Sequence, residues 1–346
     1  MAAVNDRVAK AIAEHLGKSM PKPVEPIAPV KPKEPLILKE GEQLFSKVFG
    51  YIPESGDFSV HVLPDNANPE IARLVPSVDS DYVIQQQQAA LLVAGIEDND
   101  KTLLTGPTGS GKSSLIKHIC AKLNRPFIRI NMSGDVESAA LFGSLVVRGG
   151  ATVWEDGAIT EALRYGAVCL VDEWELMPAE IAMGMQNLLE ENGYLYLKEM
   201  PASSGERTIH PHADFRIVFA GNTTGQGDTT GAFSGVGIQN SATIDRFTNT
   251  IQLGYLSMNH EIDIITSKTE IAKDDAKQMV RLAGLIRNAY DQGKLGLTMS
   301  PRTLINWGRK CKRYSKAAAM DMAYTNKLSP DDVKSVLEMY NKVFGA

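Results

Sequence analysis

One short string constrains the fold of this chain more than any other feature: Gly106-Pro-Thr-Gly-Ser-Gly-Lys112-Ser113. It fits the pattern GxxxxGK followed by Ser or Thr, between an apolar run and a helical pattern. The glycines let backbone N–H groups converge on phosphate oxygens, and the positive end of the helix adds to the field there. The alternative is a glycine-rich turn without a ligand, but motif and context together favour a phosphate-binding loop.

The pattern around this loop predicts an α/β fold. Apolar runs of four or five residues, typical of buried parallel strands, alternate with helical stretches, so we expect a parallel sheet with helices on both faces. Gly-rich or hairpin-like insertions interrupt the pattern at Leu145–Gly157 and Tyr194–His210. The predicted strands are Thr102–Thr105, Phe127–Ile130, Ala167–Val171, Ile217–Ala220 and Thr250–Leu253, and the predicted helices are Val83–Gly95, Lys112–Leu123, Ala158–Tyr165 and Ala179–Glu191.

The chain divides into five predicted segments. Residues 1–20 hold a short helix whose apolar stripe could dock on its own protein or on a partner, and 21–35 form a proline-rich linker. Residues 36–74 are a small N-terminal segment with no assigned elements. The α/β domain spans 75–254, and 255–346 form a helical domain in which Ser300 and Ser329 each precede a proline as predicted N-caps.

Composition excludes several classes of protein. The formal net charge is −5, from 36 Lys and Arg against 41 Asp and Glu, which argues against a purely electrostatic nucleic-acid binder. The longest apolar run, Ala89–Ile96, is too short to span a membrane. Asp6 and Arg7 interrupt any apolar signal sequence, so we expect a cytoplasmic protein.

Two carboxylates follow the buried strand that ends at Val171. Asp172 and Glu173 would lie at the carboxyl edge of the sheet, about sixty residues after the phosphate-binding loop. We predict that Asp172 and Ser113 hold Mg²⁺ and that Glu173 activates the attacking water as general base. The alternative is a strand that merely ends in a polar loop. The predicted nucleotide-binding residues are Gly106, Pro107, Thr108, Gly109, Ser110, Gly111, Lys112, Ser113, Ser114 and Asp172.

Another buried strand, Ile217–Ala220, leads to Asn222. An asparagine at a strand end is often only a turn former. The order of glycine-rich loop, acidic strand and Asn-tipped strand favours a second interpretation, in which Asn222 orients a water beside the terminal phosphate.

These motifs together resemble the AAA+ ATPases, from about Val75 to the end of the chain. Arg246 lies in a segment similar to the family's arginine finger, Arg302 in one similar to its sensor 2, and Asn131 where the family places a polar switch for the catalytic glutamate. The resemblance implies ATP and Mg²⁺, a helical lid domain, and a homo-oligomeric, hexameric ring. In that ring Arg246 acts on a neighbouring subunit and Arg302 on its own nucleotide.

The insertions resemble the helix-2 insert and pre-sensor-1 hairpin of the MoxR/CbbQ branch. Three longer strings are similar to the cobaltochelatase ATPase subunits: Val75–Val83, His210–Arg216 and Asn222–Gly231. This likeness implies a motor that remodels a partner complex, with a separate partner chain that carries an integrin-type metal site. A MoxR-type activase for another client, a nucleic-acid motor and a nucleotide-locked scaffold are the alternatives. Few basic residues at the insertions and the intact Glu173 and Arg246 disfavour the last two.

The helix that begins near Arg302 has a predicted basic face. At 100° per residue, Arg302, Arg309, Arg313 and Lys316 fall together, opposite Leu304 and Trp307. We interpret this face as solvated, except for Arg302 at its start.

Overall fold

A computed structural model describes residues 38–225, 227 and 239–345 of the chain. The predicted helix in residues 1–20 and the proline-rich linker lie outside the described residues. Among those that are described, no helix is both long and apolar enough to cross a membrane.

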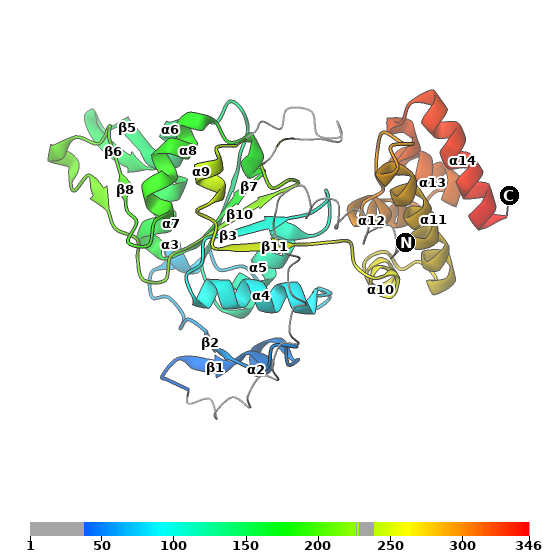
Figure 1. Ribbon diagram of the computed structural model, residues 1–346, viewed down its shortest axis with the longest axis horizontal. Coiled ribbons are helices and arrows are strands. Elements are labelled where there is room, and N and C mark those ends of the chain that lie inside the picture. Colours follow the sequence, from blue (N-terminus) through cyan, green and yellow to red (C-terminus); the bar gives the residue numbers. More distant parts are fainter. Residues whose placement is uncertain (1–37, 226, 228–238, 346) are drawn as a thin grey trace, which may run out of the picture. The chain divides into compact units, whose positions relative to one another are not determined.

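A parallel sheet of five strands forms the centre of the α/β part (Figure 1). In sheet order, β11 is followed by β3, β10, β7 and β4. The bounds are β3 Thr102–Thr105, β4 Phe127–Asn131, β7 Val168–Asp172, β10 Arg216–Gly221 and β11 Asn249–Gln252. Because the carboxyl ends of parallel strands share one edge, this order brings the ends of β3, β10 and β7 together. The predicted α/β fold is confirmed.

Helices cover both faces of the sheet (Figure 1). Successive strand residues alternate between the faces: Leu104 packs in a core with α4 and α5, whereas Leu103 packs in a second core with α7 and α8. The helices are α4 Gln86–Glu97, α5 Lys112–Lys122, α7 Ala158–Tyr165 and α8 Ala179–Met185. The helix predicted to reach Glu191 stops at Met185, and a 3₁₀ turn, η2 Gln186–Leu189, follows it.

Both insertions form antiparallel hairpins. In the first, β5 Gly143–Arg148 pairs with β6 Ala151–Asp156 after the short helix α6 Ser138–Phe142. Its tip is Gly149-Gly150, with φ of +57° and +81°, the left-handed conformation that a tight hairpin turn requires. In the second, β8 Leu195–Tyr196 pairs with β9 Thr208–Ile209, with η3 Ala202–Ser204 between them.

The segment before the sheet holds elements that we could not assign from sequence. They are β1 Glu42–Leu44, α2 Phe45–Phe49, β2 Ser59–His61 and α3 Pro69–Ala72. Buried Phe45 stacks on Phe49 at a ring-centroid distance of 4.5 Å and meets Phe58 at 4.9 Å. Phe45 also belongs to the core that holds α4 and α5, so tertiary packing stabilises this segment.

The C-terminal part is helical and has its own apolar core. Its helices are α10 Met258–Thr269, α11 Lys273–Asp291, α12 Pro301–Lys310, α13 Lys316–Ala323 and α14 Pro330–Phe344, with a turn η4 Thr325–Lys327. The Ser300 and Ser329 side chains cap α12 and α14 as predicted. The predicted basic face is wrong beyond Arg309, because α12 ends at Lys310 and Lys316 begins α13.

Candidate ATP-hydrolysis site

The glycine-rich loop runs from the end of β3 to the start of α5. Gly106, Gly109 and Gly111 have φ of +153°, +76° and +97°. A Cβ atom on Gly106 would lie 2.0 Å from the carbonyl oxygen of Leu253, so no larger residue fits there. The loop therefore needs its glycines both for backbone conformation and for close packing.

Lys112, the first residue of α5, is buried and turned back into the loop. Its Nζ donates to the carbonyl oxygen of Gly106 at 2.7 Å and to Oδ1 of Asn222 at 3.0 Å. Burial lowers the pKa of Lys112, and the nearby Glu173 and Asp172 carboxylates oppose that shift. The sheet thus holds this cation between the ends of β3 and β10.

Asp172 ends β7 beside Ser113. The Ser113 hydroxyl donates to Oδ2 of Asp172 at 2.6 Å. Arg129 on β4 reaches the same oxygen, with Nε at 2.8 Å and Nη2 at 2.6 Å. Oδ1 of Asp172 accepts from the backbone N–H of Glu173 at 3.2 Å. Hydrogen bonds from three residues therefore fix the orientation of the Asp172 carboxylate.

Glu173 and Asn222 meet at the same edge of the sheet. Nδ2 of Asn222 donates to Oε2 of Glu173 at 3.1 Å, so Asn222 bridges Glu173 and Lys112. Glu173 has φ of +54°, a left-handed backbone conformation that is uncommon for a residue with a side chain. Such strained residues cluster at functional sites, where the surrounding structure holds them in place.

Glu175 lies beneath this pair and is buried. Its Oε1 accepts the backbone N–H of Asn222 at 2.6 Å, while Oε2 has no hydrogen-bond partner within the described residues. Burial raises the pKa of Glu175. A Cβ on Gly221 would lie 2.0 Å from Oε2, so Glu175 also packs closely against the end of β10.

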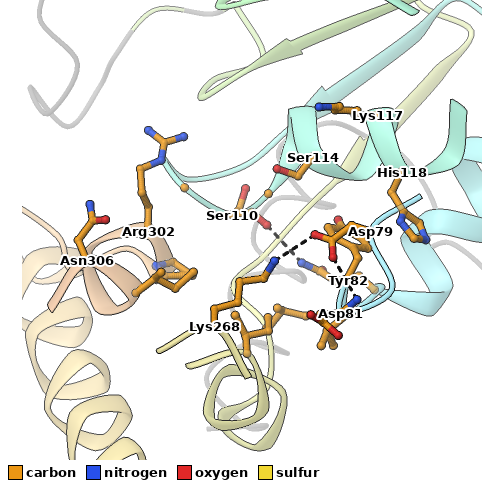
Figure 2. A pocket seen from close by; sticks show the side chains of 18 of the residues that line it. Asp79, Asp81, Tyr82, Ser110, Ser114, Lys117, His118, Lys268, Arg302 and Asn306 are labelled. Atoms are coloured by element: carbon orange, nitrogen blue, oxygen red, sulfur yellow. Dashed lines mark hydrogen bonds and ion pairs between the residues drawn. The ribbon is translucent and has the colours of Figure 1, made fainter. Parts of the chain in front are cut away.

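A cleft of about 590 Å³ opens beside the loop, lined by α12 and by the segment before α4. Figure 2 shows Arg302 and Asn306 of α12 on one side of it and Ser110 and Ser114 on the other. Arg302 is exposed, and its side chain makes no hydrogen bond or ion pair with any residue that the structure describes. Lys268 and Asp79 form an ion pair at 3.0 Å across the cleft lining (Figure 2).

Two predicted site residues do not join this arrangement within the chain. Arg246 pairs with Glu190, with Nε 2.8 Å from Oε1, rather than with its neighbour Asp245. Asn131 is exposed at the end of β4, in register with Asp172, and has no hydrogen bond to Glu173 among the described contacts.

Comparison with known proteins places the chain in a family. Residues 101–247 match the AAA domain (dynein-related subfamily), and 261–343 match the CbbQ/NirQ/NorQ C-terminal domain. The aerobic cobaltochelatase subunit CobS of a Sinorhizobium species is 32% identical over 281 residues, 78% of this chain and 83% of CobS. The chain is an AAA+ ATPase of the CobS, NorQ and CbbQ group. The predicted MoxR/CbbQ branch is therefore confirmed, and the chain is an ATP hydrolase.

Two further proteins are similar to this chain. NorQ of Paracoccus denitrificans is 28% identical over 217 residues, 61% of this chain and 73% of NorQ. The von Willebrand factor A domain-containing protein 8 of Mus musculus is 24% identical over 213 residues, 59% of this chain and 11% of that protein.

The residues at the loop of this ATPase fit a magnesium ion. The Ser113 hydroxyl and the Asp172 carboxylate are hard oxygen donors, the type that Mg²⁺ prefers, and they lie 2.6 Å apart at the mouth of the phosphate-binding loop. A nucleotide triphosphate on the loop would supply further oxygens. The chemistry of these two donors therefore suits a magnesium ion, and their role as metal ligands stays a prediction.

Sequence reasoning missed two residues of the ATPase site, Arg129 and Glu175. Arg129 is a cation in an otherwise apolar strand, two positions before Asn131 and therefore on the same face as Asn131. Glu175 completes an acidic triplet in the string Asp172-Glu-Trp-Glu175. The signal for Arg129 was a charge within a strand, and the signal for Glu175 was a third acid directly after two carboxylates.

Proposed function

We propose that this ATPase binds Mg²⁺ with ATP, assembles into a homo-oligomeric, hexameric ring and remodels a partner complex as a CobS-type motor subunit. The observation that carries the proposal is the match to CobS, which extends over 83% of that protein and beyond both family domains. NorQ matches over a shorter part of the chain and at lower identity.

The geometry supports one assignment of roles at the site. The loop amides and Lys112 bind the phosphates, and Ser113 and Asp172 hold the metal. Bound Mg²⁺ would neutralise charge on the terminal phosphates. Asn222 holds one oxygen of Glu173 at 3.1 Å, which leaves the other oxygen free to accept a proton from water. Asn222 also contacts Lys112, so the general base and the phosphate-binding cation share one support.

Two arginines complete the proposed site from opposite directions. Arg302 stands beside the loop in the same chain, where we propose that it contacts the terminal phosphate of ATP. Arg246 contacts none of the loop residues in its own chain and is partly exposed, which suits a finger for the neighbouring subunit. Asn131, opposite Asp172 in the sheet, is proposed to restrain Glu173 when the ring changes state.

The proposed partner is a separate chain with an integrin-type metal site. The name of the mouse relative joins a similar ATPase segment to a von Willebrand factor A domain within one protein. In this chain no group of three potential metal ligands occurs among the described residues. We propose, from the resemblance to the cobaltochelatase ATPase subunits, that such a domain acts in trans.

A second candidate is a MoxR-type activase for another client, because the C-terminal family match is named for relatives other than CobS. A nucleic-acid motor has less support. Arg148 of the first hairpin is paired with Glu155 at 2.9 Å, and Arg207 of the second donates to the carbonyl oxygen of Met200 at 2.6 Å. A phosphate backbone needs several free cations, and these two hairpins offer few, with acidic Glu155, Glu199 and Glu206 beside them.

An affinity capture with the Glu173→Gln variant tests the proposal. With ATP present this variant should stay ATP-bound and retain its partner, whereas Lys112→Ala provides the matched variant with impaired nucleotide binding. Recovery of a chelatase subunit with Glu173→Gln supports the CobS-type function. Recovery of an unrelated enzyme supports the activase, and recovery of DNA overturns both.

A further inference from the structure

Tyr255 connects the phosphate-binding loop to the helical domain. It lies in the short connection between β11 and α10, and its hydroxyl donates to the carbonyl oxygen of Thr108 at 3.2 Å. Thr108 is one of the loop residues between Gly106 and Lys112. Burial raises the pKa of Tyr255, and a hydrogen bond with the Thr298 side chain opposes that shift, so the hydroxyl also contacts the residue before Met299.

The ring of Tyr255 carries a cation on its face. The guanidinium carbon of Arg287, from α11, lies 4.1 Å from the ring centroid. Nη1 of Arg287 donates to Oε2 of Glu261 at 2.9 Å, and the two side chains are 12% and 1% exposed. The planar guanidinium thus contacts an aromatic face and a carboxylate at the same time.

The third contact of Arg287 leads toward Arg302. Nε of Arg287 donates to the carbonyl oxygen of Met299 at 2.8 Å. The next residue, Ser300, caps α12, and Arg302 is the second residue of that helix. A Cβ on Gly109 would lie 2.6 Å from Cβ of Ser300, so this cap also packs closely on the loop.

The buried pair is a poor choice for stability alone. Oε1 of Glu261 and Nη2 of Arg287 are buried without hydrogen-bond partners among the described residues. Burial raises the pKa of Glu261 despite the neighbouring guanidinium. Because apolar residues of similar volume are often as stabilising as a buried ion pair, these contacts point to a role in fixing one conformation.

We propose that Tyr255 and Arg287 are positioning residues that hold Arg302 in register with the phosphate-binding loop. The path runs from Thr108 through the Tyr255 hydroxyl and ring to Arg287, and from Arg287 through Met299 to the start of α12. The inference rests on the proposed contact of Arg302 with the terminal phosphate.

A double-mutant cycle tests this path. Tyr255→Phe keeps the ring over Arg287 and removes only the hydroxyl, and Arg302→Ala removes the proposed phosphate contact. Dissociation constants for ATP and ADP are measured for each variant and for the double variant, all with Glu173→Gln to prevent hydrolysis. Tyr255→Phe should weaken ATP binding about fivefold with little change for ADP, and the double variant should bind ATP no more weakly than Arg302→Ala alone.

The outcomes separate the two proposals. If Arg302→Ala leaves the preference for ATP over ADP unchanged, the phosphate contact and the path both fail. If Arg302→Ala lowers that preference but the Tyr255→Phe effect is absent, additive or equal for ATP and ADP, only the path fails. Tyr314→Phe, at an exposed position after α12, is the matched control and should bind both nucleotides as the parent does.

Arg287→Lys provides a second variant. Lysine keeps the charge but cannot contact Glu261 and the Met299 carbonyl with one planar group. At a temperature below the melting temperature of Arg287→Lys, the folded variant should lose affinity for ATP but not for ADP, as Tyr255→Phe does. A folded Arg287→Lys protein with the parent's preference for ATP would overturn the positioning role of Arg287.

Discussion

Two arginine–carboxylate pairs in this molecule differ in how much of the carboxylate is exposed to water. Arg129 lies against Asp172, whose side chain is 5% exposed, in a network that continues to Ser113. Arg246 lies against Glu190, whose side chain is 58% exposed. The Asp172 carboxylate has little access to water and is held in a fixed orientation, whereas the Glu190 carboxylate is solvated and its ion pair is weak.

The sheet edge is the part of the site whose residues already meet within one chain. The ends of β3, β7 and β10 carry hydrogen-bonded residues that already face one another. Arg246 is held by a solvated ion pair with Glu190 and by a hydrogen bond from Nη1 to the Ala242 carbonyl oxygen, and it can exchange the ion pair for another anion at small cost. We therefore expect variants at the sheet edge to fail in any assembly and a variant of Arg246 to be rescued by a neighbour.

The largest effect is expected from Glu173→Gln. An amide cannot accept a proton from water, so kcat for ATP should fall by about 10⁴-fold while ATP still binds through Lys112 and the loop amides. Phosphate release and nucleotide affinity are the measurements. Glu180→Gln, on the exposed start of α8, is the control for lost charge. Near-normal turnover in Glu173→Gln would remove Glu173 as the base.

Arg246→Ala should be the next most severe. We expect kcat to fall by about 10³-fold, the lower end of the range for arginine fingers, with ATP affinity retained. Mixing Arg246→Ala with Lys112→Ala should restore part of the turnover, because one chain then offers a working loop and the other a finger. Mixed oligomers without any rescue would contradict a finger in trans.

Arg129→Met sharpens the comparison at the first pair. It removes the two donors from Asp172 but retains much of the stem, and we expect about tenfold lower kcat through loss of carboxylate orientation. Because this arginine acts inside its own chain, mixing with Lys112→Ala should give no rescue. ATP turnover is measured side by side for Arg129→Met and Arg246→Ala, each mixed with Lys112→Ala. Recovery in the Arg129→Met mixture would mean that Arg129 does not act only within its own chain.

The sequence was sufficient for the sheet and for placing most of the candidate site residues at its carboxyl edge. The five strands of the sheet were predicted to within about a residue, because a parallel strand buried on both faces leaves a continuous apolar run. Lys112 and Ser113 begin α5 and Asp172 ends β7, the places that their local motifs predict, while their roles stay predictions. The order of the strands could not be predicted, and it is this order that brings Arg129 beside Asp172.

The failures have physical causes outside the local pattern. The helix predicted from Val83 begins at Gln86, and the Gln85 side chain instead donates to the carbonyl oxygen of Gly254 at 3.1 Å. Residues 42–61 form their elements around the contact between Phe45 and Phe58, and no periodic sequence pattern predicts that contact. Glu175 escaped notice because its partner, the backbone N–H of Asn222, is 47 positions away in the chain.

The smallest expected effect concerns Glu175, the buried acid at the sheet edge. Burial raises the pKa of Glu175 in the folded chain, so between its unfolded and folded pKa values the folded protein binds more protons than the unfolded one. Its contribution to stability therefore falls as pH rises through that window. Glu175→Gln should remove this pH dependence, because glutamine does not titrate. Its amide oxygen can still accept the Asn222 N–H, so the local structure is kept.

The melting temperature of Glu175→Gln and of the parent, measured from about pH 4.5 upward, tests this expectation. At the low end of the series the two proteins should melt within about a degree of each other, and the parent should lose stability relative to the variant as pH rises. Glu180→Gln controls for the change of net charge at an exposed carboxyl. Parallel curves for Glu175→Gln and the parent would mean that Glu175 is ionised in the fold, and its unpartnered Oε2 would then need a cation that the described residues do not supply.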